Sequence, residues 1–165
     1  ELEKYNCYRN GPFIASLLPV SSYVAFGLTT GATPDGRHAG QPIADGISPQ
    51  NGADKNGPTA AAKSVAMIDQ VRCANGIIFN QKFSPTSFSS PESTNRFIDL
   101  LFTYSRMGGG HIQFNMVTAD TLRKAQKNPS KYAGLVVRVA GYSAFFNELT
   151  TEIQDSIITR TEHTI

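Results

Sequence analysis

The sequence predicts an α/β domain, and three observations carry this prediction. Helix-like and strand-like patterns alternate from residue 59 to the end of the chain, an order that favours an α/β arrangement. The strand-like stretches are rich in β-branched and aromatic residues. The length of 165 residues suits one domain that can bury its own core.

Composition narrows the possible partners. The chain has 15 basic and 13 acidic side chains and a net charge of only +2, with no basic stripe, so we expect no nucleic-acid partner. Its apolar runs are too short to cross a bilayer, so we expect no membrane partner either. Cys7 and Cys73 form neither a disulfide framework nor a metal-ligand pattern, and we interpret both as buried inert thiols in a reducing cytoplasm. The start at Glu1 without Met predicts the tail of something longer.

The first 58 residues are predicted to hold little regular structure. Residues 13–26 are expected to be extended, although Pro19 argues against a central strand. Residues 27–58 are polar, glycine-rich and without a helix or strand period. A connection of this length is uncommon in a compact domain, and its scattered isoleucines and prolines predict a loop laid over another surface.

The remainder alternates between helices and strands. Pro58 suits the first turn of a helix, and Gly108 is a typical helix stop. Apolar residues at helical or alternating spacing define the other elements. The predicted order is helix 59–72, strand 76–83, helix 91–106, strand 111–117, helix 119–127, strand 135–140 and helix 151–160.

The sequence contains no conventional pattern for a phosphate-binding loop, a catalytic nucleophile or a metal site. The glycines at 108–110 follow a helix and precede a strand, the reverse of a phosphate-binding loop, so we interpret them as a turn. No histidine has a nucleophile or metal ligand at a useful spacing, and no EF-hand pattern accompanies the aspartates, so no metal site is expected. We therefore predict structural roles for His38, His111 and His163, and turn-forming roles for Asp35, Asp45 and Asp54.

One glycine remains unexplained. Gly141 interrupts the apolar stretch RVAGYSAFF. A glycine inside a strand-like pattern usually marks a bulge, a bend or a close backbone approach. The residue types alone leave these local alternatives open.

The amino-acid sequence on both sides of Gly141 resembles the C-terminal part of a glycyl radical enzyme. The stretches that carry the resemblance are GATPDGRHAG, ADGISP, GPTAAAKSVAMID, NGIIFNQKFSP, GGGHIQFNMV, VVRVAGYSAFF and IQDSIITRTEH. They cover nearly the whole chain in order. The superfamily includes pyruvate formate-lyase and glycerol dehydratase, and ADGISP and HIQFN are similar to its dehydratase, lyase and decarboxylase side rather than to formate-lyase proper.

The resemblance implies a fold and a division of the chain. The chain would be the C-terminal portion of the ten-stranded α/β barrel of these enzymes. Residues 1–58 would supply a strand and a long loop that complete the barrel of a larger enzyme. Residues 59–165 would form the glycine radical domain, with the radical loop at 138–146.

The resemblance also implies the chemistry. Gly141 would store a radical installed by a separate S-adenosylmethionine and iron–sulfur activating enzyme, and no other cofactor would bind this chain. The stored radical would pass to a cysteine on a larger partner polypeptide or a missing upstream segment. The sequences around Cys7 and Cys73 do not match the sequence around that cysteine in the family. This chain alone would therefore be inactive. Residues expected to support the loop are Arg138, Val139, Ala140, Tyr142, Ser143 and Phe145, with Phe146 among the apolar flanks that exclude water and oxygen.

The substrate is expected to be a small molecule. By similarity, residues 13–23 pass the substrate with alternate side chains inward, which places Ile14, Ser16 and Leu18 on a mostly apolar wall. The implied activity is that of an anaerobic lyase or dehydratase. Two alternatives stay open: an autonomous glycyl radical cofactor that repairs a damaged enzyme, and the radical part of a hydrocarbon–fumarate addition or arylacetate decarboxylase enzyme.

Overall fold

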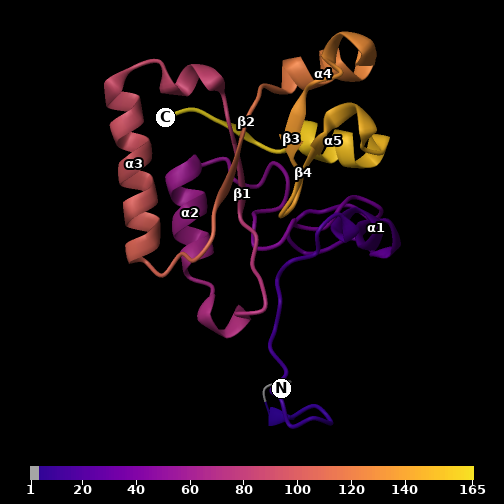
Figure 1. Cartoon of the computed structure of the whole chain (residues 1–165), viewed down its shortest axis with the longest axis vertical. Coiled ribbons are helices and arrows are strands. Elements are labelled where there is room, and N and C mark those ends of the chain that lie inside the picture. The colour runs from indigo at the N-terminus through magenta and orange to yellow at the C-terminus, as the bar shows by residue number, and fades with distance from the viewer. Residues whose placement is uncertain (1–3) are drawn as a thin grey trace.

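A three-stranded parallel sheet forms the centre of the protein in this computed structural model, which describes residues 4–165 (Figure 1). Residues 1–3, the start of the expected 1–58 segment, lie outside the described part. The sheet order is β2 (Gln113–Met116), β1 (Asn80–Phe83) and β5 (Glu162–His163). All four residues of β1 are buried, so this strand is covered on both faces.

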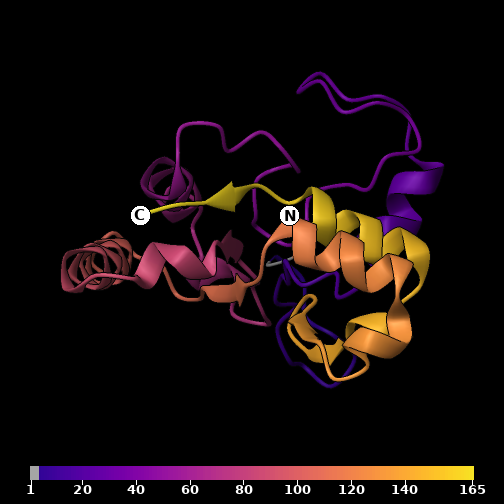
Figure 2. The same ribbon diagram turned by 90° about the horizontal axis from the view of Figure 1, so that it is seen from above.

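Helices α2 (Pro58–Ala66) and α3 (Pro91–Arg106) lie on one side of this sheet (Figures 1 and 2). A capping box at Ser90 begins α3 by satisfying backbone donors of the first turn. The core between these helices and the sheet centres on Phe83, whose ring contacts other aromatic rings at centroid distances of 5.7 to 5.9 Å. These rings are Phe88, Phe97, Phe114 and His163.

The other side of the sheet carries two helices and a β-hairpin (Figure 2). The helices are α4 (Ala119–Lys127) and α5 (Thr151–Thr159), and the antiparallel hairpin consists of β3 (Val136–Arg138) and β4 (Ser143–Phe145). Fully buried apolar side chains join these elements into a second core: Leu122, Val137, Val139, Phe146 and Ile157. The hairpin is thus packed from within this chain.

Several predicted elements need correction. Residues 13–26 are not extended throughout, because Ser22–Thr29 form helix α1, and Leu17 makes only an isolated parallel bridge with Ile77. The helix predicted over 59–72 ends at Ala66 and is followed by a 3₁₀ turn at Val71–Cys73. There the Gln70 side chain bonds the Val65 carbonyl and the backbone N–H of Gly110, which fixes a bend rather than another helical turn.

The strand predicted over 135–140 is regular only at Val136–Arg138 and does not enter the parallel sheet. Val137 is buried while Val136 is exposed, so this strand is covered on one face only. The physical reason is visible in β2, where the Asn115 side chain bonds the Arg138 backbone in place of a neighbouring strand.

The long connection of residues 27–58 lies on this chain's own surface. The backbone N–H of Ile43 donates to the Tyr23 carbonyl, and that of Ile47 donates to the Ile78 carbonyl at 2.8 Å. Arg37 is buried in the connection and donates to four backbone carbonyls. Among residues 4–165 no helix is long and apolar enough to cross a membrane.

Candidate functional site: the glycine hairpin

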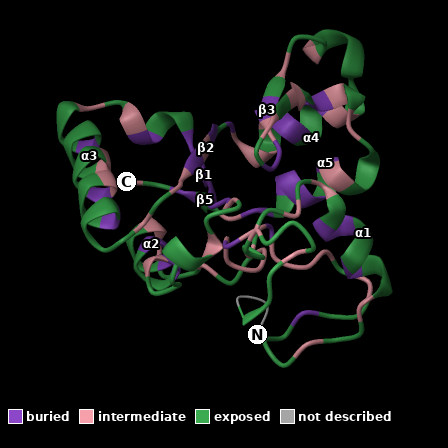
Figure 3. Ribbon diagram, turned by 60° about the horizontal axis from the view of Figure 1, so that its bottom comes forward, coloured by how far each residue is buried: buried purple, intermediate pink, exposed green. Residues whose placement is uncertain are grey.

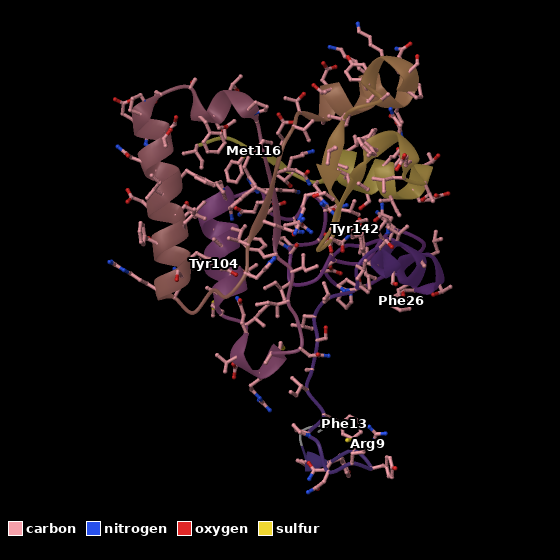
Figure 4. All side chains as sticks on the ribbon, viewed as in Figure 1. Arg9, Phe13, Phe26, Tyr104, Met116 and Tyr142 are labelled. Carbon is pink, nitrogen blue, oxygen red and sulfur yellow. The ribbon has the colours of Figure 1, made fainter. Side chains whose placement is uncertain are left out.

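Gly141 occupies the turn between β3 and β4, with a backbone φ of +84° that favours glycine. Tyr142, the next residue, lies near the centre of the molecule and away from Phe13 in the N-terminal segment (Figure 4). A Cβ atom placed on Gly141 would lie 2.8 Å from Cδ1 of Ile78 and 3.4 Å from Cδ1 of Leu18. Both the backbone conformation and the nearby Ile78 side chain therefore favour glycine here.

Three amide side chains on one face of the sheet bind the last residue of β3 or the residue after it, and we call Asn80, Gln113 and Asn115 the amide clamp. Asn80 lies opposite Gln113 in the register of β1 and β2, and Asn115 follows two residues later, so the strand period places all three on the same face. Asn115 accepts from the Arg138 N–H at 2.7 Å and donates to the Arg138 carbonyl at 2.6 Å. Gln113 accepts from Nε of Arg138 at 2.7 Å.

A buried ion pair reinforces this clamp at Val139. Nη2 of Arg160, just after α5, donates to the Val139 carbonyl and to Oδ2 of Asp45, each at 2.8 Å. Asn80 Nδ2 donates to the same carbonyl at 3.3 Å and also to Asp45. Burial raises the pKa of Asp45 to about 6, because it opposes the charged carboxylate more strongly than Arg160 and Asn80 favour it. The Asp45 charge is therefore costly and depends on Arg160.

The clamp stops two residues before the glycine. In the described part of the chain, no hydrogen bond reaches the backbone N–H or carbonyl of Gly141, whereas Val139 N–H donates to the Tyr142 carbonyl at 2.9 Å. The peptide groups on either side of the Gly141 Cα thus make no hydrogen bonds within the described part of the chain. On the side where a side chain would project from that atom, the nearest heavy atoms belong to the apolar side chains of Ile78 and Leu18.

The predicted support residues lie around this turn in different environments. Arg138 is hydrogen-bonded, as expected for a half-buried guanidinium, through Gln113 and through the Ser143 hydroxyl at 3.2 Å. Val139 and Ala140 are fully buried. Phe145 is 44% exposed, so within this chain it does not shield the glycine, while Phe146 is fully buried. Gly141 itself is exposed in this chain.

The residues of the predicted substrate wall lie before helix α1 in a segment without a regular strand. Ile14, Ser16 and Leu18 are exposed, and the intervening Leu17 is more buried. Of the three, Leu18 lies against Gly141. The Ser16 hydroxyl donates to the Gly76 carbonyl at 3.4 Å, and Ile14 stays 49% exposed.

Sequence reasoning missed the clamp and the ion pair. Asp45 does begin a turn, in which the Ser48 N–H donates to its carbonyl at 3.0 Å, but its side chain also pairs with Arg160. The carboxylate of Asp54 lies 2.9 Å from Nε2 of His163, a contact that the sequence did not predict. Asp35 does lie in a turn and accepts from the Thr33 hydroxyl. Two sequence features pointed to the clamp. Polar residues occupy alternate positions of HIQFN, and the polar run NQK lies in an otherwise apolar strand. His111 is structural as predicted, since its Nδ1 accepts from the Phe79 N–H.

Comparison with known proteins shows which family this chain belongs to. Residues 43–147 match the glycine radical family. The chain belongs to this family. The glycine radical domain of this chain therefore includes the hairpin, the amide clamp and Asp45.

Relatives of the domain include enzymes of the dehydratase and decarboxylase kinds, which confirms the predicted side of the superfamily. Trans-4-hydroxy-L-proline dehydratase of Clostridioides difficile is 41% identical over 98% of this chain and 22% of that protein. Indoleacetate decarboxylase of Tractidigestivibacter scatoligenes is 44% identical over 96% of this chain and 18% of that protein. The chain spans about a fifth of the length of these relatives.

The fold class is confirmed by solved structures. The glycerol-bound form of the B12-independent glycerol dehydratase from Clostridium butyricum superposes with a TM-score of 0.95 and 48% sequence identity. The match covers 99% of this chain and 21% of that one. The α/β arrangement with its parallel sheet is thus one portion of a glycyl radical enzyme fold.

Proposed function

We propose that this chain is the radical-storing part of an anaerobic glycyl radical lyase or dehydratase, with the radical on Gly141. The observation that carries the proposal is the conformation of Gly141 in a member of the glycine radical family. Its Cα lies at a turn with positive φ, its flanking peptides are free of hydrogen bonds among the described residues, and the hairpin is clamped up to Val139.

Glycine suits this role for chemical reasons. The Cα–H bond of Gly141 breaks, and the hydrogen atom with its electron goes to the 5′-deoxyadenosyl radical generated by a separate S-adenosylmethionine and iron–sulfur activating enzyme. The carbon radical that remains is delocalised over the two neighbouring amides and becomes planar. A side chain would hinder that flattening, and the absent Cβ removes the obstacle.

The radical is then passed to a cysteine outside this chain, which abstracts hydrogen from a small substrate. Neither Cys7, beside Gly11 in the N-terminal segment, nor Cys73, in the 3₁₀ turn after α2, is assigned that role. In this proposal residues 1–58 complete the barrel, and residues 59–165 form the radical-bearing part. The two free thiols fit a reducing cytoplasm.

Oxygen is expected to cut the activated chain at Gly141. Dioxygen adds to the exposed carbon radical, and the peroxyl product breaks the backbone there. After anaerobic activation and exposure to air, mass spectrometry should find a new chain end at residue 141, and protein that was never activated should stay intact. Cleavage that is independent of activation, or that maps to another residue, would contradict the assignment.

Figure 3 shows exposed residues along the N-terminal segment and on the helices, and many of them are large and apolar, which supports a larger partner polypeptide or upstream segment. Large hydrophobic side chains stay open to solvent on the N-terminal segment, on α1, after α2 and on α3, and Gly141 is uncovered. Examples are Tyr8 at 96%, Val71 at 85%, Met67 at 80%, Phe102 at 62% and Leu28 at 61% exposed. Exposed apolar area on several faces is typical of an interface, and a stored radical needs cover from oxygen.

Expressed alone, the chain is therefore expected to be self-associated, loosely folded or insoluble, and inert. Co-expression with the polypeptide that supplies the rest of the barrel should give a soluble complex. Sedimentation and amide hydrogen exchange measure both states. A soluble, well-protected monomer that turns over substrate without a partner would be incompatible with the proposal.

A further inference from the structure

We propose that Ile78 is the positioning residue for Gly141: its side chain forms the floor that fixes the location of the radical carbon. The inference rests on the proposed function of Gly141. Ile78 precedes β1 and is 2% exposed, and its Cδ1 would lie 2.8 Å from a Cβ on Gly141. Real Cβ atoms are not found that close to another heavy atom, so Ile78 occupies the space that a side chain at residue 141 would need.

Ile78 is itself held in place by a second glycine. Its carbonyl accepts from the Ile47 N–H at 2.8 Å, and a Cβ on Gly46 would lie 2.3 Å from that oxygen and 3.1 Å from the Ile78 Cβ. Ile78 therefore lies between two glycines with positive φ, Gly46 at +62° and Gly141 at +84°. The β-branched side chain of Ile78 has a restricted χ1, which fixes where Cγ1 lies, and burial limits the room in which Cδ1 can turn.

The Ile78 side chain fixes the position of Gly141, which the polar contacts leave free. The amide clamp and Arg160 fix residues 138 and 139, but no hydrogen bond in the described chain reaches the Gly141 backbone. Leu18, the other neighbour of Gly141, is 37% exposed, and its Cδ1 would lie 3.4 Å from a Cβ on Gly141, an ordinary contact distance. A glycine has no side chain to lock its own position, so the buried Ile78 determines where the Cα lies for hydrogen transfer.

A double-mutant cycle in the intact protein tests the contact without activity. Ile78→Val removes Cδ1 and leaves the rest of the side chain. With Ile78 present, Gly141→Ala should speed amide hydrogen exchange of the 135–146 peptides about tenfold or more, from overpacking and positive-φ strain together. In Ile78→Val the same change should have a clearly smaller effect, about threefold less, because only the strain remains.

Ile77→Val is the matched control. Its Cδ1 would lie 3.4 Å from a Cβ on Gly110 and belongs to the core on the other side of the sheet. The effect of Gly141→Ala should be unchanged in that background. Equal effects of Gly141→Ala in all three backgrounds would overturn the role of Ile78.

Radical spectroscopy adds a measurement that would not change if Ile78 had only a packing role. In activated protein, Ile78→Val should change the splitting by the remaining Gly141 α-hydrogen or shorten the radical lifetime, and Ile77→Val should change neither. If wild-type protein forms no radical, the proposed function fails while the exchange cycle still tests the contact. If wild type forms the radical but Ile78→Val and Ile77→Val behave alike in both measurements, Ile78 is not the positioning residue.

Discussion

Replacing Arg160 with Met is expected to loosen the glycine hairpin by about 3 to 5 kcal/mol, because it leaves the Asp45 carboxylate buried without its positive partner. Asp45 is 4% exposed, and Arg160 also donates to the Val139 carbonyl, so the variant loses an ion pair and a hydrogen bond to the residue that follows β3. Amide hydrogen exchange of the 135–146 peptides in the intact protein measures the loss.

The effect should depend on pH in a defined direction. The folded protein binds the Asp45 proton more tightly than the unfolded chain does, since the pKa is raised from 3.8 to about 6. The stability contributed by that proton is present below pH 3.8 and is lost as the pH rises through about 6. Arg160 is the group that opposes this rise, so Arg160→Met should raise the pKa further and be more harmful at pH 8 than at pH 5 after correction for intrinsic exchange.

Lys124→Met is the control, because it breaks the Lys124–Asp120 pair, in which both side chains are mostly exposed. Surface pairs contribute little, so exchange at the hairpin should not change. If Arg160→Met and Lys124→Met have equal effects, or if the Arg160 effect is the same at both pH values, the buried pair does not hold the hairpin.

Gly46→Ala is expected to have a comparably large effect, about 2 to 5 kcal/mol, from overpacking together with a non-glycine residue at positive φ. The new Cβ would meet the Ile78 carbonyl oxygen at 2.3 Å, and a backbone atom cannot rotate out of the way. The 45–48 segment must shift, which also displaces Asp45 from Arg160. Thermal unfolding and hydrogen exchange at residues 76–83 report the damage.

Gly134→Ala is the matched control for this substitution. An added Cβ there meets nothing within 4 Å, and the backbone has no positive φ. The substitution should be neutral or slightly stabilising, because alanine has less freedom in the unfolded chain. Similar unfolding temperatures for Gly46→Ala and Gly134→Ala would show that the contact with Ile78 does not constrain residue 46.

Local patterns predicted the helices on either side of the sheet and drew attention to Gly141. The Ser90 cap and the apolar spacing that followed it were sufficient for α3, and the glycine was conspicuous because it broke an apolar run. Helix α1 was missed because Pro19 and the β-branched residues before and within it suggested an extended chain, whereas the helix begins only at Ser22.

The amide clamp could not be predicted from local patterns, because its contacts join residues far apart in the sequence. Asn115 binds Arg138, and Asp45 meets Arg160, across separations that no helix or strand period encodes. The strand alternation in HIQFN did indicate that Gln113 and Asn115 share a face. What that face binds depends on the hairpin's position, which is set by the second core rather than by strand pairing.

The central claim is that Gly141 holds the radical, and electron paramagnetic resonance after anaerobic activation tests it most directly. The intact protein, incubated with its activating enzyme and S-adenosylmethionine, is predicted to show a doublet from the single α-hydrogen left on Gly141. Gly134→Ala, whose added Cβ meets nothing nearby, should retain that doublet, and Gly141→Ala should lose it. An undiminished doublet in Gly141→Ala would contradict the claim.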